Sequence, residues 1–409
     1  MNPSALKKHF PWFVKGVASR IYFDNAATSQ KPMQVINAEF DFYTNQNASV
    51  HRGLYEVAES ATSAYEQVRA KVAAFINARY PEEIIFNSGA TEGINSFAAM
   101  WQRHLSPGDE IIITQAEHHA NLLPWQRLAQ QTGAVLKFFP LDAATHCIVQ
   151  DAIDLISPKT KLVAVAHCSN VLGSIWQEGQ LEAIIQKAHQ GGAKVLLDAA
   201  ASVAHKKIDV QKLSIDAMVF SGHKMLGPTG IGVLYLRKEV HDVCEPYQLG
   251  GSMVYSVSYE AAQWAKAPQK FEAGTPPIAQ VMGLGAAVDF YKQFIDFEAL
   301  KKHEAELCKV LLEGLTKICG VRLLGNKTLI EQQGHLVTFV VDGIHAHDLA
   351  AYLSSRNFMV RAGHHCAQPL AQLLGAQSSL RVSFLMYNTS DEVLQFLDAL
   401  RDGIRTLGL

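Results

Sequence analysis

Short apolar runs alternate with amphipathic stretches through the middle of the chain. Runs suited to buried strands lie at residues 83–86, 110–114, 135–139, 162–167, 194–198, 218–220 and 231–235. Between several of them apolar residues recur at helical spacing, as in residues 181–190. This alternation predicts an α/β fold with a mainly parallel central sheet covered by helices on both faces. In such sheets, ligands bind at the carboxyl ends of the strands.

The two ends of the chain follow a different pattern. Helices are predicted near the N-terminus at residues 35–45 and 61–76, after residues 21–28, where a strand runs into a polar turn. The C-terminal part predicts helices at 297–315, 346–355 and 390–407, strands at 321–324 and 335–341, and a loop at 361–369. We therefore predict an N-terminal arm (1–20) that packs with the small domain, a large domain (21–290) and a smaller α+β domain (291–409).

Composition narrows the functional classes. The 409 residues are 48% hydrophobic and 18% charged, with a net charge of −2, which is typical of a globular protein and argues against a nucleic-acid-binding role. The six cysteines form no CxxC pair, which fits a reducing compartment. We find no apolar segment typical of a signal peptide or a membrane helix. The expected location is cytoplasmic, without membrane or nucleic-acid partners.

A lysine and an aspartate each follow an apolar run. Lys224 lies in Phe220-Ser221-Gly222-His223-Lys224, just after one predicted strand, and Asp198 ends another. Strand ends of a parallel sheet meet at one edge, so these side chains are expected to lie close together. An imine-forming lysine and an acid that keeps a pyridine nitrogen protonated suit pyridoxal phosphate. The alternatives are a surface lysine and a capping aspartate.

Other strand ends carry polar side chains that suit the same cofactor. The segment Asn87-Ser88-Gly89-Ala90-Thr91-Glu92 opens a helix at 93–101, where a phosphate can bind, and Ser221 and His223 offer further donors. The alternative for this segment is an ordinary N-cap. His118 could stack on a flat ring or simply cap a helix. Asn170 could bond a ring oxygen or be a turn asparagine.

The segment Arg361-Ala362-Gly363-His364-His365-Cys366 places a thiol beside imidazoles and a guanidinium. Such surroundings can lower a thiol pKa and produce a reactive thiolate at Cys366. The alternatives are a structural cysteine and a metal site, which we disfavour because adjacent residues of an extended chain point apart. Arg381 could pair with a substrate carboxylate or form a surface salt bridge.

Together these motifs resemble the fold type I, class V aminotransferase family of pyridoxal-phosphate enzymes. More narrowly, the chain is similar to type II cysteine desulfurases, including selenocysteine-lyase-like members. The most specific segments are Ser221-Gly222-His223-Lys224, Glu117-His118-His119-Ala120-Asn121 and Arg361-Ala362-Gly363-His364-His365-Cys366, and Phe271-Glu272-Ala273-Gly274-Thr275-Pro276 also fits.

The resemblance implies a role for each matching residue. Lys224 binds the cofactor covalently, Asp198 faces its ring nitrogen, His118 stacks on the ring, and Cys366 accepts sulfur from L-cysteine. The resemblance also implies that Thr91, Ser221 and His223 contact the cofactor phosphate, with Ala90 in the same loop. It implies a homodimer in which Thr275 contacts the phosphate bound by the other subunit. The implied substrate contacts come from Asn170, Arg361, Arg381, His51 and Arg52. A SufE-like protein is the implied sulfur acceptor for iron–sulfur cluster assembly or related sulfur metabolism.

Three positions depart from the family pattern. A glutamine that bonds the ring hydroxyl is replaced by Ala201, and a phosphate-loop threonine by Ala90. The threonine often found between Arg361 and Gly363 is Ala362, as in some other members. Losing one hydrogen bond at Ala201 costs about 1 kcal/mol, which mistunes the cofactor without preventing binding. Selenocysteine lyase, another class V activity, and an inactive scaffold therefore stand as alternatives to cysteine desulfurase.

Overall fold

The computed structural model describes residues 2–15 and 20–408. Its centre is a seven-stranded sheet in the order β2-β8-β7-β6-β5-β3-β4. The strands are β2 (Ile84–Asn87), β3 (Glu110–Thr114), β4 (Val135–Phe139), β5 (Thr160–Ala166), β6 (Lys194–Asp198), β7 (Ala217–Ser221) and β8 (Gly232–Leu236). In this sheet β8 alone runs antiparallel to its neighbours, so the predicted mainly parallel α/β sheet is confirmed.

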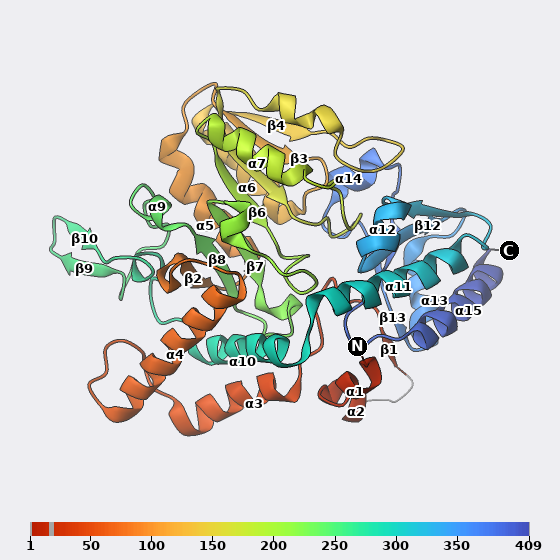
Figure 1. Ribbon diagram of the computed structural model, residues 1–409, viewed down its shortest axis with the longest axis horizontal. Coiled ribbons are helices and arrows are strands. Elements are labelled where there is room, and N and C mark those ends of the chain that lie inside the picture. Colours follow the sequence, from red (N-terminus) through yellow and green to blue (C-terminus); the bar gives the residue numbers. More distant parts are fainter. Residues whose placement is uncertain (1, 16–19, 409) are drawn as a thin grey trace.

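Helices cover both faces of this sheet (Figure 1). Successive strand residues belong to two hydrophobic clusters, one on each face, which explains the near-continuous apolar strands. The helices of this part are α3 (Met33–Asp41), α4 (Glu56–Phe75), α5 (Ala90–Trp101), α6 (Leu123–Thr132), α7 (Gln180–Gln190), α8 (Val210–Leu213), α9 (Lys238–His241) and α10 (Ile278–Phe294).

A four-stranded antiparallel sheet in the order β11-β12-β15-β14 forms the core of the C-terminal part. Its strands are β11 (Val321–Leu324), β12 (Leu336–Val341), β14 (Arg361–Gly363) and β15 (Ser379–Ser383). Its helices are α11 (Phe297–Leu315), α12 (Lys327–Gln333), α13 (Ala346–Ser355), α14 (Gln368–Leu373) and α15 (Ser390–Leu407). The segment expected as a loop at 361–369 thus contains a strand and the start of α14.

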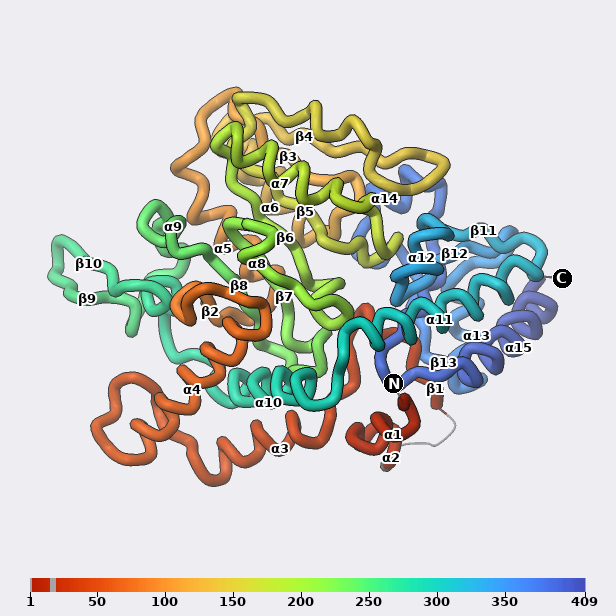
Figure 2. Tube along the Cα trace, viewed as in Figure 1, coloured from red at the N-terminus to blue at the C-terminus, as the bar shows by residue number. Residues whose placement is uncertain are grey.

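The N-terminal residues lie beside this C-terminal part (Figure 2). Helices α1 (Pro3–Lys7) and α2 (Pro11–Lys15) precede the short strand β1 (Ile21–Tyr22), which pairs in parallel with β13 (Phe358–Met359). The prediction that a strand runs into a polar turn over 21–28 is therefore confirmed, with the turn at residues 25–27. Lys7 forms an ion pair with Glu392 of α15 at 2.5 Å. Phe10 packs edge-on against Tyr387, with ring centroids 4.9 Å apart, and against Phe290 of α10.

Two glycines of α10 bring this helix close to the lysine-bearing loop and to α4. A Cβ atom on Gly283 would lie 2.4 Å from Pro228, and one on Gly285 would lie 2.5 Å from Val68. Any larger residue at either position would push α10 away from these neighbours. Because Pro228 follows Lys224 by only four residues, the close approach of α10 helps to fix the loop that carries the lysine.

A hairpin of β9 (Val254–Val257) and β10 (Ala262–Trp264) extends from the main body, at the left of Figure 1. Neither the hairpin nor α10 was predicted. Within the part of the chain that the structure describes, no helix is long and apolar enough to cross a membrane.

Candidate active site

Most of the predicted site residues line one cavity of about 200 Å³. Those residues are Ala90, Thr91, His118, Asn170, Asp198, Ser221, His223, Lys224, Arg361, Cys366 and Arg381. They come from strand ends of the central sheet and from β14 and β15 of the C-terminal sheet. The cavity therefore lies where the two sheets meet. Ala26, Ala27, Cys168 and His365 also line it and were not predicted.

Lys224 and Asp198 occupy neighbouring positions at the edge of the central sheet. Asp198 is the last residue of β6, which pairs with β7, and Lys224 ends the single 3-10 turn that follows β7. Burial lowers the pKa of Lys224, and the charge of Asp198 partly opposes this shift. Burial likewise raises the pKa of Asp198, whose carboxylate accepts a hydrogen bond from the Ala200 backbone N–H at 2.9 Å. The two groups thus face one cavity, Asp198 as a buried acid and Lys224 as a half-buried amine.

The turn that carries Lys224 is fixed through one carbonyl oxygen. The backbone oxygen of His223 accepts hydrogen bonds from Lys31 Nζ at 2.7 Å, the Ser29 backbone N–H at 3.0 Å, and the Thr28 and Ser29 hydroxyls at 3.1 Å. Burial lowers the pKa of Lys31 to about 7, although the charge of Glu39 opposes the shift. Sequence patterns gave no sign of this role, because Lys31 lies almost two hundred residues before the turn.

The N-terminus of α5 forms the opposite end of the cavity. Its first backbone N–H, from Ala90, donates to Ser221 Oγ at 2.9 Å, and Thr91 follows at the exposed rim. Burial lowers the pKa of His223 to about 4, so this imidazole is neutral at physiological pH. Free N–H groups and the positive end of the helix dipole make this end suitable for a phosphate.

His118 lines the cavity and also caps a short 3-10 helix (His119–Asn121). Its Nδ1 accepts a hydrogen bond from the Ala120 backbone N–H at 3.0 Å. Burial, aided by the nearby charge of Lys224, lowers the His118 pKa to about 4. The ring is therefore neutral, with its proton on Nε2. The helix-capping interpretation of this residue is confirmed, and its place in the cavity wall leaves stacking on a flat ring as a prediction.

Arg381 is held rigidly in the cavity wall. Its Nη2 pairs with Asp24 Oδ1 at 3.2 Å, and its Nη1 donates to the Asn170 backbone oxygen at 2.9 Å. The Arg381 side chain is only 2% exposed, so the surface-salt-bridge alternative is wrong. Among the described residues its Nε has no hydrogen-bond partner. Burial lowers the pKa of Arg381 to about 10, but the group stays cationic at neutral pH. The Asp24 contact was not predicted.

Cys366 lies on a strained turn. Both His365 and Cys366 have left-handed backbone conformations, with φ values of 52° and 57°. Each such non-glycine residue costs about 1 kcal/mol, so surrounding contacts must hold the turn. The Arg361 guanidinium Nη2 approaches Cys366 Sγ at 4.0 Å, and Asn170 Nδ2 donates to the His365 carbonyl at 2.5 Å. Among residues 2–15 and 20–408, no three His, Cys, Asp or Glu side chains group as metal ligands would.

Two of the three departures from the family pattern line the cavity. Ala201 and Ala90 both contribute to its wall, whereas Ala362 lies in β14 outside it. Ala201 follows Asp198 by three residues, so a glutamine at this position would extend into the space beside the Asp198 carboxylate.

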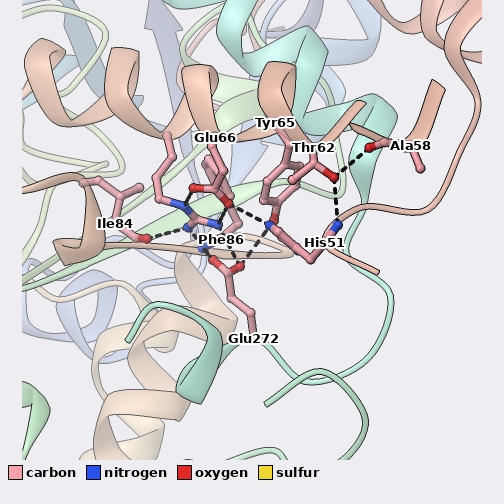
Figure 3. A network of polar contacts seen from close by, with 9 residues as sticks. His51, Ala58, Thr62, Tyr65, Glu66, Ile84, Phe86 and Glu272 are labelled. Carbon is pink, nitrogen blue, oxygen red and sulfur yellow. Dashed lines mark hydrogen bonds and ion pairs between the residues drawn. The ribbon is translucent and has the colours of Figure 1, made fainter. Parts of the chain in front are cut away.

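Three predicted residues lie outside this cavity. Thr275 lines a separate cavity, and His51 and Arg52 are exposed. A polar network joins the segments that carry them (Figure 3): His51 Nε2 bonds Glu66 at 2.8 Å, and Arg69 pairs with both Glu66 at 2.8 Å and Glu272 at 2.7 Å. Because Glu272 precedes Thr275 by three residues, this network fixes both segments to α4.

Comparison with known proteins gives consistent matches. The family model for aminotransferase class-V matches residues 21–396. A probable cysteine desulfurase of Halalkalibacterium halodurans is 44% identical, covering 99% of this chain and 97% of the relative. A probable cysteine desulfurase of Synechocystis sp. is 46% identical over 94% of this chain and 91% of the relative.

Solved structures agree with the sequence matches. The cysteine desulfurase CsdA from Escherichia coli has a TM-score of 0.91 at 37% identity, covering 100% of this chain and 99% of that one. The apo cysteine desulfurase of Thermococcus onnurineus NA1 has a TM-score of 0.93 at 38% identity, with the same coverage. On the family match and these relatives, the chain belongs to the aminotransferase class-V family.

Proposed function

We propose that this chain is a pyridoxal-phosphate-dependent cysteine desulfurase. It would convert L-cysteine to L-alanine and leave the sulfur as a persulfide on Cys366. One observation carries the proposal: a half-buried lysine, a buried aspartate and a cysteine on a strained turn line the same cavity. Relatives called cysteine desulfurases match nearly the whole chain, which supports the same activity.

The cavity residues fit pyridoxal phosphate. The amine of Lys224 can hold the aldehyde, Asp198 can pair with the ring nitrogen, and the neutral His118 ring offers a stacking surface. Thr91, Ser221, His223 and the N-terminus of α5 would hold the phosphate. When bound, the cofactor supplies an aromatic ring that stabilises negative charge developing at the substrate Cα.

The residues of the chain would move a proton and a sulfur atom. Burial lowers the pKa of Lys224, which favours a neutral amine that can remove the substrate Cα proton. The Cys366 thiolate then attacks the substrate sulfur, so that one S–S bond forms as the substrate Cβ–S bond breaks. Cβ takes up a proton, and alanine leaves. Arg381, Asn170 and Arg361 would orient the substrate carboxylate, and no external oxidant or reductant is needed for this half-reaction.

We further propose a homodimer in which Thr275, His51 and Arg52 contribute to the partner subunit's cavity. These residues lie outside the cavity of their own chain. The segments around them expose large apolar side chains, including Leu54 (95% exposed) and Tyr259 at the tip of the β9–β10 hairpin (106%). The hairpin and the α3–α4 connection lie on the same side of the molecule (left in Figure 1). Apolar surface of this extent is typical of an interface.

The persulfide must leave Cys366 for turnover to continue. We propose a SufE-like sulfur-acceptor protein that docks near Cys366, with iron–sulfur cluster assembly or related sulfur metabolism as the destination. A cytoplasmic location is supported by six free cysteines, four of them buried in an apolar interior. We also propose the three-part division at residues 20 and 290. The Lys7–Glu392 ion pair supports packing of the arm against the C-terminal part.

Product analysis tests the proposed function. The purified protein, loaded with pyridoxal phosphate, is given L-cysteine and a thiol reductant. Alanine and sulfide should appear in equal amounts. A keto acid in place of alanine would indicate transamination, and turnover of L-selenocysteine alone would indicate a selenocysteine lyase. An absorbance band near the visible edge that borohydride removes should accompany activity, and its absence would favour an inactive scaffold.

A further inference from the structure

His119 makes two contacts with the segment that carries Cys366, and no role for it has been assigned above. Its backbone N–H donates to the Cys366 carbonyl oxygen at 2.7 Å. Its side-chain Nε2 accepts a hydrogen bond from the Gln368 backbone N–H at 3.0 Å. His119 therefore contacts the chain on both sides of Ala367. One contact is to Cys366 itself, and the other is to Gln368, the first residue of α14.

The turn needs such support. His365 and Cys366 are consecutive non-glycine residues with left-handed backbone, a conformation that persists only where neighbouring groups enforce it. Two further contacts, from Asn170 to the His365 carbonyl and from the His365 ring to Ser379 Oγ, act on His365, and the Arg361 guanidinium approaches the side-chain thiol of Cys366. The His119 contacts act on Cys366 and the residues after it.

The chemistry of the His119 ring suits this contact. Gln368 is the donor, so Nε2 must be unprotonated. Burial and the neighbouring His364 lower the pKa of His119, which keeps Nε2 available as an acceptor at neutral pH. The preceding residue, His118, lines the cavity. One dipeptide thus presents one imidazole to the cofactor site and a second to the nucleophile segment.

We propose that His119 is a positioning residue for the proposed desulfurase reaction, and that it holds the Cys366 thiol at the cavity through the Cys366 carbonyl and the Gln368 N–H. The inference rests on the proposed function but concerns the position of the thiol rather than the chemistry of the cofactor. In Figure 1, α14 lies beside the part of the central sheet near β3 and away from most of the C-terminal helices. The His119 contacts connect these two parts.

Side-chain reach at position 119 provides the test. In His119→Gln the amide oxygen can reach the place of Nε2 and accept from Gln368, whereas the shorter side chain of His119→Asn falls short. His119→Leu removes the acceptor altogether. We expect kcat for alanine formation from cysteine to fall about five- to tenfold in the Asn and Leu variants, as for one lost hydrogen bond, with KM within twofold. The Gln variant should stay close to the parent protein.

A second readout does not depend on turnover. The rate at which iodoacetamide alkylates Cys366 is measured by peptide mass spectrometry, with the exposed Cys319 as internal reference. Release of the turn should raise the Cys366 rate severalfold in the Asn and Leu variants and leave Cys319 unchanged. Gln372→Ala is the matched control, because this exposed side chain lies on α14, which begins just after the turn, and its loss should leave the alkylation rate unchanged.

The outcomes separate this inference from the proposed function. If the Gln and Asn variants behave alike in both kcat and alkylation, the side-chain contact has no positioning role and the inference is wrong. A different outcome is that none of the proteins forms alanine while Cys366 is still alkylated faster in the Asn and Leu variants than in the Gln variant and the parent. In that case His119 still holds the thiol, and only the proposed function fails. Should His119→Leu not fold, the Gln and Asn pair alone decides.

Discussion

The two halves of the cavity are built in different ways. Asp198 ends β6, and Lys224 ends the 3-10 turn that directly follows the neighbouring buried strand β7, a turn that Lys31 and Ser29 also hold through the His223 carbonyl. Cys366 stands on a turn with two consecutive left-handed residues, and its position depends on contacts with side chains and backbone from the other half. The cofactor end is thus fixed by the central sheet together with the contacts of the His223 carbonyl, whereas the nucleophile end is fixed by contacts that cross between the two sheets.

This difference suits the chemistry of the proposed reaction. A proton transfer at a bound cofactor requires groups that stay in place, and strand ends supply them. A thiol that collects sulfur at the cavity and then delivers it to another protein must be able to leave the cavity. A strained turn held by a few hydrogen bonds can be released at a small energetic cost.

The largest effect is expected at the fixed half. Lys224→Ala removes the amine that we propose to hold the aldehyde and to remove the Cα proton, so alanine formation should fall by more than about 10³-fold. The absorbance band near the visible edge should shift, because a covalent link to the protein can no longer form. Near-normal activity in this variant would contradict the assignment of Lys224.

At the other half, Cys366→Ser should abolish the persulfide and reduce alanine formation from cysteine by about 10²-fold or more. The absorbance band should remain, because the cofactor end is separate from the turn. The same variant can still process selenocysteine, since selenium is the better leaving group. Full alanine release from cysteine in Cys366→Ser would show that sulfur leaves by another route. Cys168→Ser, the other thiol that lines the cavity, is the matched control.

A smaller effect is expected from restoring a glutamine at position 201, near Asp198 in the cofactor end of the cavity. Ala201→Gln places an amide beside Asp198, where it can bond the cofactor ring hydroxyl. One added hydrogen bond is worth about 1 kcal/mol, so cofactor affinity should rise about fivefold and the absorbance maximum should shift. Titration of the cofactor-free protein measures this change, and Ala201→Leu separates the hydrogen bond from the added volume.

The smallest effect concerns Lys31, which supports the Lys224 turn. Burial lowers its pKa from 10.5 to about 7. Between these values the unfolded chain binds more protons than the folded one, so this group makes stability rise as pH increases from 7 toward 10. The parent protein should therefore gain about 1 kcal/mol relative to Lys31→Met between pH 7 and 8 in urea unfolding. If the difference in free energy of unfolding between the two proteins does not change with pH, the pKa of Lys31 is not lowered in the folded protein.

The sequence predicted the fixed half of the cavity better than the other. Lys224, Asp198 and Ser221 each lie at or just after the end of an apolar strand. Recognising these strands from their apolar residues is therefore enough to predict that the three side chains lie close together. The contacts of Lys31 with the His223 carbonyl, of Asp24 with Arg381 and of His119 with Gln368 were missed. Each joins residues far apart in the chain, often through backbone atoms that carry no sequence signal.

Secondary structure shows the same division. The seven central strands were found at almost their observed positions, because most of them are buried on both faces and therefore apolar, although the edge strand β4 is largely exposed. The exposed β9–β10 hairpin and the short strand β14 were missed. β14 has only three residues, and its pairing with β15 depends on tertiary contacts that local patterns do not reveal.

Peptide mass spectrometry after a brief incubation of the cofactor-loaded protein with L-cysteine tests the central claim most directly. The account predicts that the peptide containing Cys366 gains the mass of one sulfur atom, in proportion to the alanine released in a single turnover. Alanine released without that gain, or the added sulfur on another of the six cysteines, would contradict it.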